Sequence, residues 1–498
     1  MNVGIVRRPR ITAAFLIVGT LALYASTAGG SLTSTDAVVS FDLTRSIVDR
    51  HSIALSGNLL GLDANRGVDG RYYSQYGLGQ SLYNVPFYIA GSAAQRLIHR
   101  RIGKPDTLPK AAVALGSAVA AAIAVLLVWY LSLQIGATQR ASVVAAVSAA
   151  VASPLWPYSK FGFSTALTAV ILLGAACLLL DASARASAAR AAAAGVVIGF
   201  GWLTRHEMAL VLLPFVAFIL LDARDKGIGW RLASAFVACA CAGGVVWGWY
   251  NFVRFNSPLS VGYTPSTDFS GYAAFLVSPA GSVLIFAPIV LLWIFGLFRA
   301  NAMSTARRVL LAGPLVVFYL FYGALADWAG GRSYGPRYLV PALMLLAPGA
   351  ALVWDSRALR HRTVAAVIVC AALLQLPGVL VDYSKVSVQW ARAATKTEID
   401  ERNWHAASSP FVLGARAALR AVPANIAYLA GRQPPPLETV ASTDDRDFAQ
   451  QLSFSLDFWW MYLFYLRALS ARAAILAGAV LMIVAALCGI GAWKASTS

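Results

Sequence analysis

Long apolar runs constrain the fold of this chain more than any other feature. Residues 111–130, 232–249 and 473–492 are apolar over about 20 residues, the length that crosses the hydrocarbon core of a bilayer as an α-helix. A transmembrane β-barrel would instead show short segments of alternating polarity. Hydrophobic residues make up 59% of the chain and charged residues 12%. We therefore expect an all-α polytopic membrane protein.

The apolar runs predict a bundle of about 12 to 13 transmembrane helices. The candidate spans lie at 11–30, 82–98, 110–133, 141–156, 164–181, 191–203, 207–221, 232–250, 273–297, 309–326, 338–354, 364–382 and 473–493. Three parts follow from their spacing. Residues 1–382 form the main membrane module, 383–472 form a polar loop with an interfacial aromatic helix near its end, and 473–498 form the last span and a short tail.

Charge predicts which side of the membrane each loop occupies. The net charge of +18 comes largely from basic clusters between apolar runs, as in residues 299–308 and 355–363. Cytoplasmic loops of membrane proteins carry such an excess of Lys and Arg, so the charge does not indicate a nucleic-acid partner. The basic N-terminus is then cytoplasmic, as an uncleaved first helix. The polar stretches 31–81, 251–272, 327–337 and 383–472 share the extracytoplasmic face.

The number of candidate spans before residue 251 disagrees with this topology. Eight candidate spans precede residue 251, and an even number would place the 251–272 loop in the cytoplasm. Merging 191–203 and 207–221 into one broken helix around the sequence TRHE would make the number odd. Irregular backbone survives at membrane depth only where protein or water lines it.

The first outer loop offers two candidate acids. Asp36 lies just beyond the first span, before a stretch whose apolar residues recur at helical spacing and predict a helix on the membrane surface. At that position a carboxylate is either an N-cap or a catalytic base. Asp42 lies within the stretch, where simple solvation of the surface helix is the competing interpretation.

Arginines on the outer side indicate an anionic ligand, because the charge rule does not expect them there. The candidates there are Arg254 in YNFVRFNSP, and Arg332 and Arg337 in WAGGRSYGPRYL. Arg205 in TRHE is a further candidate because it interrupts a long apolar stretch, and an ionisable group at membrane depth usually faces a cavity or a partner. The structural alternatives stay open: Arg205 pairs with Glu207, and the others bind loop carboxylates or carbonyls.

The segment DGRYYSQYGLGQSL is unusually polar and aromatic for the start of an apolar run. Tyr72, Tyr73, Gln75 and Tyr76 would suit a sugar-binding surface, with an interfacial aromatic belt as the alternative. The chain has no Walker loop, Rossmann fingerprint or zinc motif, and its five cysteines all lie in apolar segments. We expect no metal site and no cofactor, although a divalent metal is possible for some chains of this kind.

The order of the motifs DGRYYSQYGLGQSL, YNFVRFNSPLSVGY, SPAGSVLIFAPIVLL and WAGGRSYGPRYLVPAL resembles the GT-C superfamily of polyprenyl-phosphate-dependent glycosyltransferases. The nearest branch would be the bacterial one related to protein O-mannosyltransferases and the aminoarabinose transferase of lipid A. The resemblance implies a GT-C bundle in the bacterial cytoplasmic (inner) membrane with an extracytoplasmic active site. Its donor is a polyprenyl-phosphate-linked sugar, and its acceptor is a glycan, lipid or protein of the cell envelope.

The resemblance also implies roles for single residues. The catalytic acid of the family corresponds best to Asp36, with Asp42 in reserve, and the reaction is an inverting displacement. The arginines would stabilise the departing lipid phosphate. Relatives often carry Asp-Glu at residues 36–37 and an acid near residue 164, where this chain has Asp-Ala and FGFSTAL.

Two rival functions remain at this point. A transporter or flippase for a lipid-linked sugar could use the same arginines, but it would need a polar pathway through the spans. A glycan polymerase or ligase would use a polyprenyl-diphosphate donor instead of a monophosphate.

Overall fold

A computed structural model describes residues 7–56, 64–98, 105–262, 266–299, 303–331, 333–432 and 456–496. Among these, six helices are long and apolar enough to cross a membrane. They are α1 (Arg7–Thr27), α4 (Thr107–Gln134), α7 (Ser164–Ala184), α10 (Gly229–Phe255), α14 (Thr305–Gly323) and α24 (Ala471–Ala495). The predicted all-α membrane fold is confirmed.

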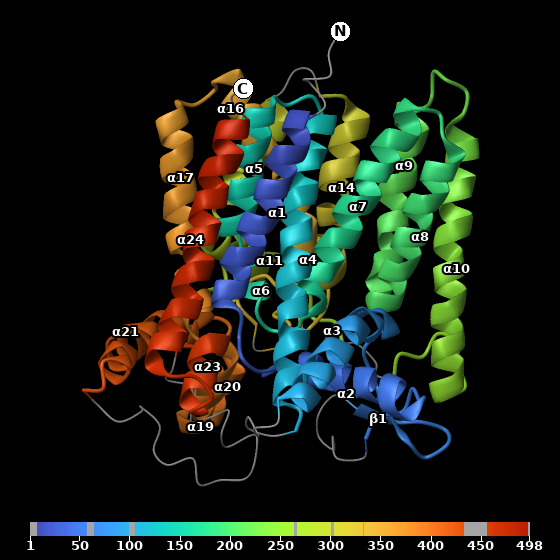
Figure 1. The fold of residues 1–498 in the computed structure, drawn as a ribbon. Coiled ribbons are helices and arrows are strands. Elements are labelled where there is room, and N and C mark those ends of the chain that lie inside the picture. Colours follow the sequence, from blue (N-terminus) through green and yellow to red (C-terminus); the bar gives the residue numbers. More distant parts are fainter. Residues whose placement is uncertain are drawn as a thin grey trace.

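Shorter helices complete the bundle (Figure 1). They are α5 (Gln139–Val151), α8 (Ala188–Thr204), α9 (Leu212–Asp222), α13 (Ile289–Arg299), α16 (Pro348–Ser356) and α17 (His361–Leu373). Small residues let neighbours approach closely, as is usual between membrane helices. A Cβ atom on Gly243 of α10, for example, would overlap the backbone of Gly199 on α8.

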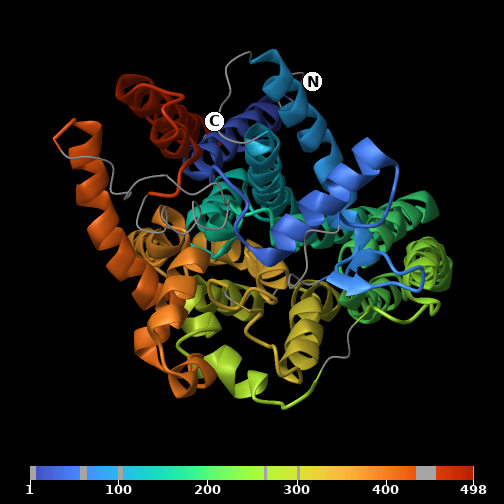
Figure 2. The ribbon, with the colours of Figure 1, turned by 90° about the horizontal axis from the view of Figure 1, so that it is seen from below.

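The bundle has two different ends. Both chain ends lie at one of them, which we call the terminal face (Figure 1). The other end, the loop face, carries the elements outside the bundle (Figures 1 and 2). These are α2 (Thr35–Arg50), the hairpin β1 (Ala64–Arg66) and β2 (Tyr72–Ser74), α3 (Leu78–Leu97), α19 (Tyr383–Ala393), α20 (Lys396–Asp400), α21 (Pro410–Leu429) and α23 (Trp459–Tyr465).

The predicted span at 82–98 is wrong. Helix α3 covers these residues, but it lies across the loop face beside α2 and is not apolar enough to count as a span (Figure 1). It packs on the part of α4 that projects beyond the bundle, where the Tyr83 hydroxyl donates to the carbonyl of Gly116 at 2.8 Å. Polar residues at the start of α3, among them Gln80 and Asn84, explain why it stays out of the apolar layer.

The suggested merger of 191–203 and 207–221 is also wrong. Helix α8 ends at Thr204, Arg205 is extended at φ −147°, and the 3₁₀ helix η1 (His206–Val211) leads into α9 in the reverse direction. The Ser183 hydroxyl at the end of α7 donates to the Asp222 carboxylate at the end of α9 at 2.5 Å. The chain therefore makes a hairpin at Arg205.

These two corrections together remove the disagreement between the number of predicted spans and the expected side of the 251–272 loop. With α3 excluded and α8 and α9 separate, the crossings before residue 256 are odd in number: α1, α4, α5, α7, α8, α9 and α10. The stretch after α10 thus lies at the loop face with the first loop. A backbone hydrogen bond of 3.1 Å from Val68 to Arg254 joins the two directly.

Prolines divide several predicted spans into pieces. Residues 273–297 hold α11 (Gly271–Val277), α12 (Val283–Phe286) and α13, with Pro288 at the second break. Breaks near other prolines produce α6 (Leu155–Tyr158), α15 (Val340–Leu343) with η2 (Met344–Leu346), and α18 (Leu376–Leu380). Proline lacks the N–H that continues a helix.

The predicted interfacial aromatic helix is α23. The indole N–H of Trp459 donates to the carbonyl of Ala25 at 2.8 Å, and that of Trp460 to the carbonyl of Ser26 at 2.9 Å. The aromatic residues thus satisfy the last carbonyls of α1, which have no partner within the helix.

Candidate active site

Asp36 lies in the first turn of α2. Ser34 is the N-cap, and its hydroxyl accepts from the backbone N–H of Ala37 at 3.3 Å. The N-cap interpretation of Asp36 is therefore wrong, and its side chain is free for another role. That side chain is 21% exposed at the loop face.

Both carboxylate oxygens of Asp36 have a partner from a distant segment. Tyr76, at the turn before α3, donates its hydroxyl to Oδ1 at 2.9 Å. Arg337 donates from Nη2 to Oδ2 in an ion pair. Three of the predicted site residues thus meet at one carboxylate.

Arg337 is buried, with 8% of its side chain exposed. Its Nη1 donates to the carbonyl of Gly330 at 3.3 Å, and its guanidinium lies 4.1 Å from the ring centroid of Phe163. Gly330 has φ +66°, a left-handed conformation that turns this carbonyl toward the arginine. The Nε of Arg337 is buried and has no hydrogen-bond partner among the described residues.

Arg205 has a similar unfilled donor. It pairs with Glu207, Nε to Oε1 at 2.5 Å, and its Nη2 donates to the hydroxyl of Tyr322 at 2.7 Å. Tyr322 in turn donates to Glu207. The third nitrogen of Arg205, Nη1, is buried and has no hydrogen-bond partner among the described residues. The alternative that Arg205 pairs with Glu207 therefore holds, yet one of its nitrogens remains unused.

Tyr338 joins the two arginines. Its ring centroid lies 5.1 Å from the Arg205 guanidinium and 5.6 Å from that of Arg337, and it stacks on Tyr322 at 4.1 Å. Two buried cations with unused donors thus share one aromatic ring. Such a pair is suited to a phosphate, which accepts several charge-assisted hydrogen bonds at once.

Glycines bring the tyrosine-rich segment to Arg205. A Cβ atom on Gly77 would overlap the carbonyl oxygen of Leu203, and one on Gly79 would overlap the side chain of Thr204. The start of α3 therefore touches the backbone just before Arg205. The two glycines of the sequence YGLGQ allow this close approach. This explains why a glycine-rich segment stands at the start of an apolar run.

Arg254 has a structural role in this site. Its Nη1 donates to the carbonyl of Ser74, Nη2 to Asn251 at 2.5 Å and Nε to Tyr250 at 3.2 Å. It is buried, and all three nitrogens are used. Arg254 thus holds the hairpin onto the end of α10, and the structure does not bring it to Asp36.

Tyr73 belongs to the same scaffold. It is buried and donates its hydroxyl to Asp69 at 2.8 Å, and this hydrogen bond is the main reason why the pKa of Asp69 is lowered to about 2. Tyr72 packs beside Leu55 in a small apolar cluster, and Gln75 lies half-buried in the turn next to Tyr76. Arg332 lies outside the described residues.

Asp42 is buried and fully engaged. Its carboxylate accepts from Arg45, from the Ser56 backbone and from the Ser56 hydroxyl, each at 2.7 Å. These bonds fasten the segment after α2 to the helix. The arrangement leaves Asp42 no free oxygen at the centre formed by Asp36 and Arg337.

Sequence reasoning did not single out Tyr322, Tyr338 or Phe163. Tyr322 is hidden in the apolar run VVFYLFYG, and nothing in its spacing separates it from a core aromatic. Lys160 was not predicted from the sequence either. It is completely buried, donates to the carbonyl of Val379, and its Nζ lies 3.4 Å from Oδ2 of Asp457. This pair ties the segment before α7 to the chain that enters α23.

The described residues contain no group of three or more His, Cys, Asp or Glu side chains that could hold a metal ion. At Asp36 the neighbour is a cation rather than a second carboxylate. Phe163, immediately before the position where relatives often carry an acid, places its ring against that cation.

Comparison with known proteins identifies this architecture. Residues 103–249 match the model of the dolichyl-phosphate-mannose-protein mannosyltransferase family. The apo structure of ArnT from Cupriavidus metallidurans aligns with 96% of this chain and 76% of its own, with a TM-score of 0.51 at 15% sequence identity. The chain has the GT-C fold. The resemblance stated from the sequence is thereby confirmed at the level of the fold.

Two further GT-C structures align less closely. The archaeal oligosaccharyltransferase AglB from Archaeoglobus fulgidus has a TM-score of 0.45 at 13% identity, over 88% of this chain and 61% of its own. Arabinosyltransferase EmbB from Mycobacterium smegmatis has a TM-score of 0.41 at 13% identity, over 97% of this chain and 42% of its own. No curated protein matches the chain by sequence.

Proposed function

We propose that this chain is a membrane glycosyltransferase that moves a sugar from a polyprenyl-phosphate donor to a hydroxyl acceptor of the cell envelope. The observation that carries the proposal is the contact of Asp36 with Arg337, a carboxylate and a buried cation with an unused N–H, at the loop face of a GT-C bundle. The matched family model, named for a dolichyl-phosphate-mannose donor, supports a lipid-phosphate donor. The loop face is then the extracytoplasmic face, and the bilayer is the bacterial cytoplasmic membrane.

The proposed reaction is a single inverting displacement. Asp36 accepts the proton of the acceptor hydroxyl while the hydroxyl oxygen forms a bond to the anomeric carbon of the sugar. The bond from that carbon to the donor phosphate oxygen breaks, and its electron pair leaves with the polyprenyl phosphate. Because bond formation and cleavage occur on opposite faces of the carbon, the configuration inverts.

Arg337 and Arg205 would stabilise the leaving phosphate. Each has one buried nitrogen without a partner, Nη1 in Arg205 and Nε in Arg337, and both guanidinium groups lie near the ring of Tyr338. Donor binding would draw Arg337 toward the phosphate, which weakens its hold on Asp36 and makes that carboxylate a better base. Arginines that meet charge as it develops on a leaving phosphate act where the barrier is highest.

The test is sugar transfer in nanodiscs from radiolabelled polyprenyl-phosphate sugars to a cell-envelope extract, with wild type and Asp36→Asn side by side. We expect the variant to lose transfer by a factor of about 10²–10⁴, the range for a general base. Its thermal stability should fall as well, because buried Arg337 loses its ion-pair partner, so transfer is compared at a temperature where both proteins are folded. Asp225→Asn, on the exposed connection between α9 and α10 at the terminal face, is the matched control.

Other outcomes would contradict the proposal in distinct ways. Transfer that survives Asp36→Asn would move the base elsewhere. Transfer only from polyprenyl-diphosphate sugars would indicate a polymerase or ligase. Movement of lipid-linked sugar across the bilayer without transfer would indicate a flippase.

A further inference from the structure

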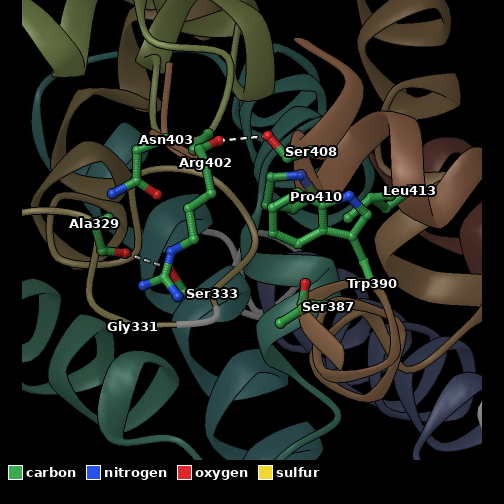
Figure 3. Close-up of a pocket in the computed structure, with 12 residues that line it drawn as sticks. Ala329, Gly331, Ser333, Ser387, Trp390, Arg402, Asn403, Ser408, Pro410 and Leu413 are labelled. Atoms are coloured by element: carbon green, nitrogen blue, oxygen red, sulfur yellow. Dashed lines mark hydrogen bonds between the residues drawn. The ribbon is translucent and has the colours of Figure 1, made fainter. Parts of the chain in front are cut away.

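A second polar site lies at the loop face, where Ala329, Gly331 and Ser333 face the α19–α21 region. Figure 3 shows this pocket, where the side chain of Arg402 extends toward the turn, with Asn403 on the same side and Trp390 and Ser387 opposite. The pocket is partly open, and its volume is about 30 Å³. One water molecule needs about 10–15 Å³, so the pocket has room for a group the size of a carboxylate or part of a phosphate.

Two polar side chains of this pocket, those of Arg402 and Asn403, are unused among the described residues. Arg402 and Asn403 bond through their backbone carbonyls, which accept from Ser408 at 2.6 Å and from Ser278 at 2.5 Å. No hydrogen bond or ion pair of the Arg402 guanidinium or the Asn403 carboxamide occurs within the described part of the chain. The backbone contacts hold both residues in place while their side chains face the pocket.

The pocket adjoins the proposed catalytic centre through one short turn. Gly331 and Ser333 line it, and the neighbouring Gly330 accepts from Arg337. Asp327, whose carboxylate accepts from the Gly331 N–H at 3.3 Å, lies within electrostatic range of Arg402, Arg337 and Asp36. A molecule with a group in the pocket could therefore present a nearby hydroxyl to Asp36.

We propose that this pocket binds an anionic substituent, a carboxylate or a phosphate, of a carbohydrate acceptor. Arg402 supplies the countercharge, Asn403 and Ser387 supply hydrogen bonds, and the indole of Trp390 packs against the sugar. This assignment rests on the proposed function and narrows the acceptor class to acidic glycans or phosphorylated glycolipids. Arginine is suited to the role because its planar fork matches both anions.

The proposed anion site can be tested without any sugar donor. The test measures how three soluble probes bind to the full-length protein in nanodiscs. The probes are radiolabelled glucuronate, glucose 6-phosphate and glucose, measured by equilibrium dialysis. We expect one charged sugar to bind about tenfold or more tightly than glucose, since a charge-assisted pair is at stake. Which of the two binds identifies a carboxylate or a phosphate.

Two variants separate the pocket from general charge effects. Arg402→Gln should reduce binding of the charged sugar to that of glucose, whereas Arg420→Gln, an exposed arginine of α21 outside the pocket, should bind as wild type does. Equal binding of all three probes, or binding unchanged by Arg402→Gln, would overturn the site.

A transfer assay then decides the acceptor role. The bound sugar should compete with the envelope acceptor, and Arg402→Gln should raise the acceptor KM about tenfold or more with little change in kcat. An unchanged acceptor KM would overturn that role. If wild type transfers no sugar at all, the proposed function fails, while the binding measurements still decide whether the anion site exists.

Discussion

Arg337 and Asp36 form an ion pair across 301 residues of sequence, and it joins the first loop to the turn after α14. Arg337 uses two of its nitrogens, on Asp36 and Gly330, and keeps Nε unused. The pair is thus both a structural link and a place where an incoming anion finds a donor. The predictions below separate these two roles.

Replacement of Arg337 tests its role toward the leaving group. Arg337→Ala should reduce transfer by about 10²–10³, the usual effect of removing one donor that stabilises developing charge. Arg337→Lys should transfer sugar faster than Arg337→Ala but more slowly than wild type, because an ammonium cannot reach Asp36, Gly330 and a phosphate together. Transfer rates and thermal unfolding in detergent check both variants. Full activity of Arg337→Lys would show that only the charge matters.

Tyr76→Phe removes the hydroxyl that donates to Asp36 at 2.9 Å. One hydrogen bond to a carboxylate contributes about 1.5–3 kcal/mol, so we expect transfer to fall by about tenfold to a hundredfold. Tyr130→Phe, on α4 far from Asp36, is the matched control. An unchanged transfer rate would mean that Tyr76 does not act through Asp36.

Glu207→Ala tests the buried pair at the α8–η1 junction. The Glu207 side chain is 4% exposed and that of Arg205 is 10% exposed. Removal of one partner of a buried pair costs about 3–5 kcal/mol, because the other charge is left without compensation. The double variant Arg205→Met with Glu207→Leu should be less destabilised than the sum of the single changes. Thermal unfolding of all three checks this, and strict additivity would contradict the coupling.

Chelation tests whether a metal takes part. Asp36 is paired with a guanidinium, and the ring of Phe163 covers the other side of that cation. We therefore expect EDTA to leave the transfer rate unchanged. Loss of transfer that Mg²⁺ or Mn²⁺ restores would show that residues outside the described ranges, or the donor itself, supply ligands.

Cysteine labelling tests the revised topology. In a background without the native cysteines, Val68→Cys at the loop face should react with a membrane-impermeant maleimide in intact spheroplasts. Arg185→Cys, exposed between α7 and α8, should react only after the membrane is opened. The merged-helix topology predicts labelling of residue 185 from outside, so that outcome would restore it.

The sequence alone predicted the fold class, the family resemblance and much of the site. Length and hydropathy identify membrane helices because a spanning helix must satisfy its backbone internally and be apolar outside. The position after the first span and the family resemblance pointed to Asp36, an unusually aromatic segment to Tyr76, and out-of-place charge to Arg205 and Arg337. The structure brings these four residues to one end of the bundle.

Only the tertiary structure decided which polar residues are free to act. Arg254 and Arg337 look alike in sequence, but every side-chain nitrogen of Arg254 donates to a carbonyl or an amide oxygen, while Nε of Arg337 has no partner among the described residues. Helix α3 is long enough to span a membrane, yet it packs across the loop face. Such outcomes depend on contacts between segments hundreds of residues apart. Local hydropathy and spacing carry no information about those contacts, because each contact exists only once the helices have packed.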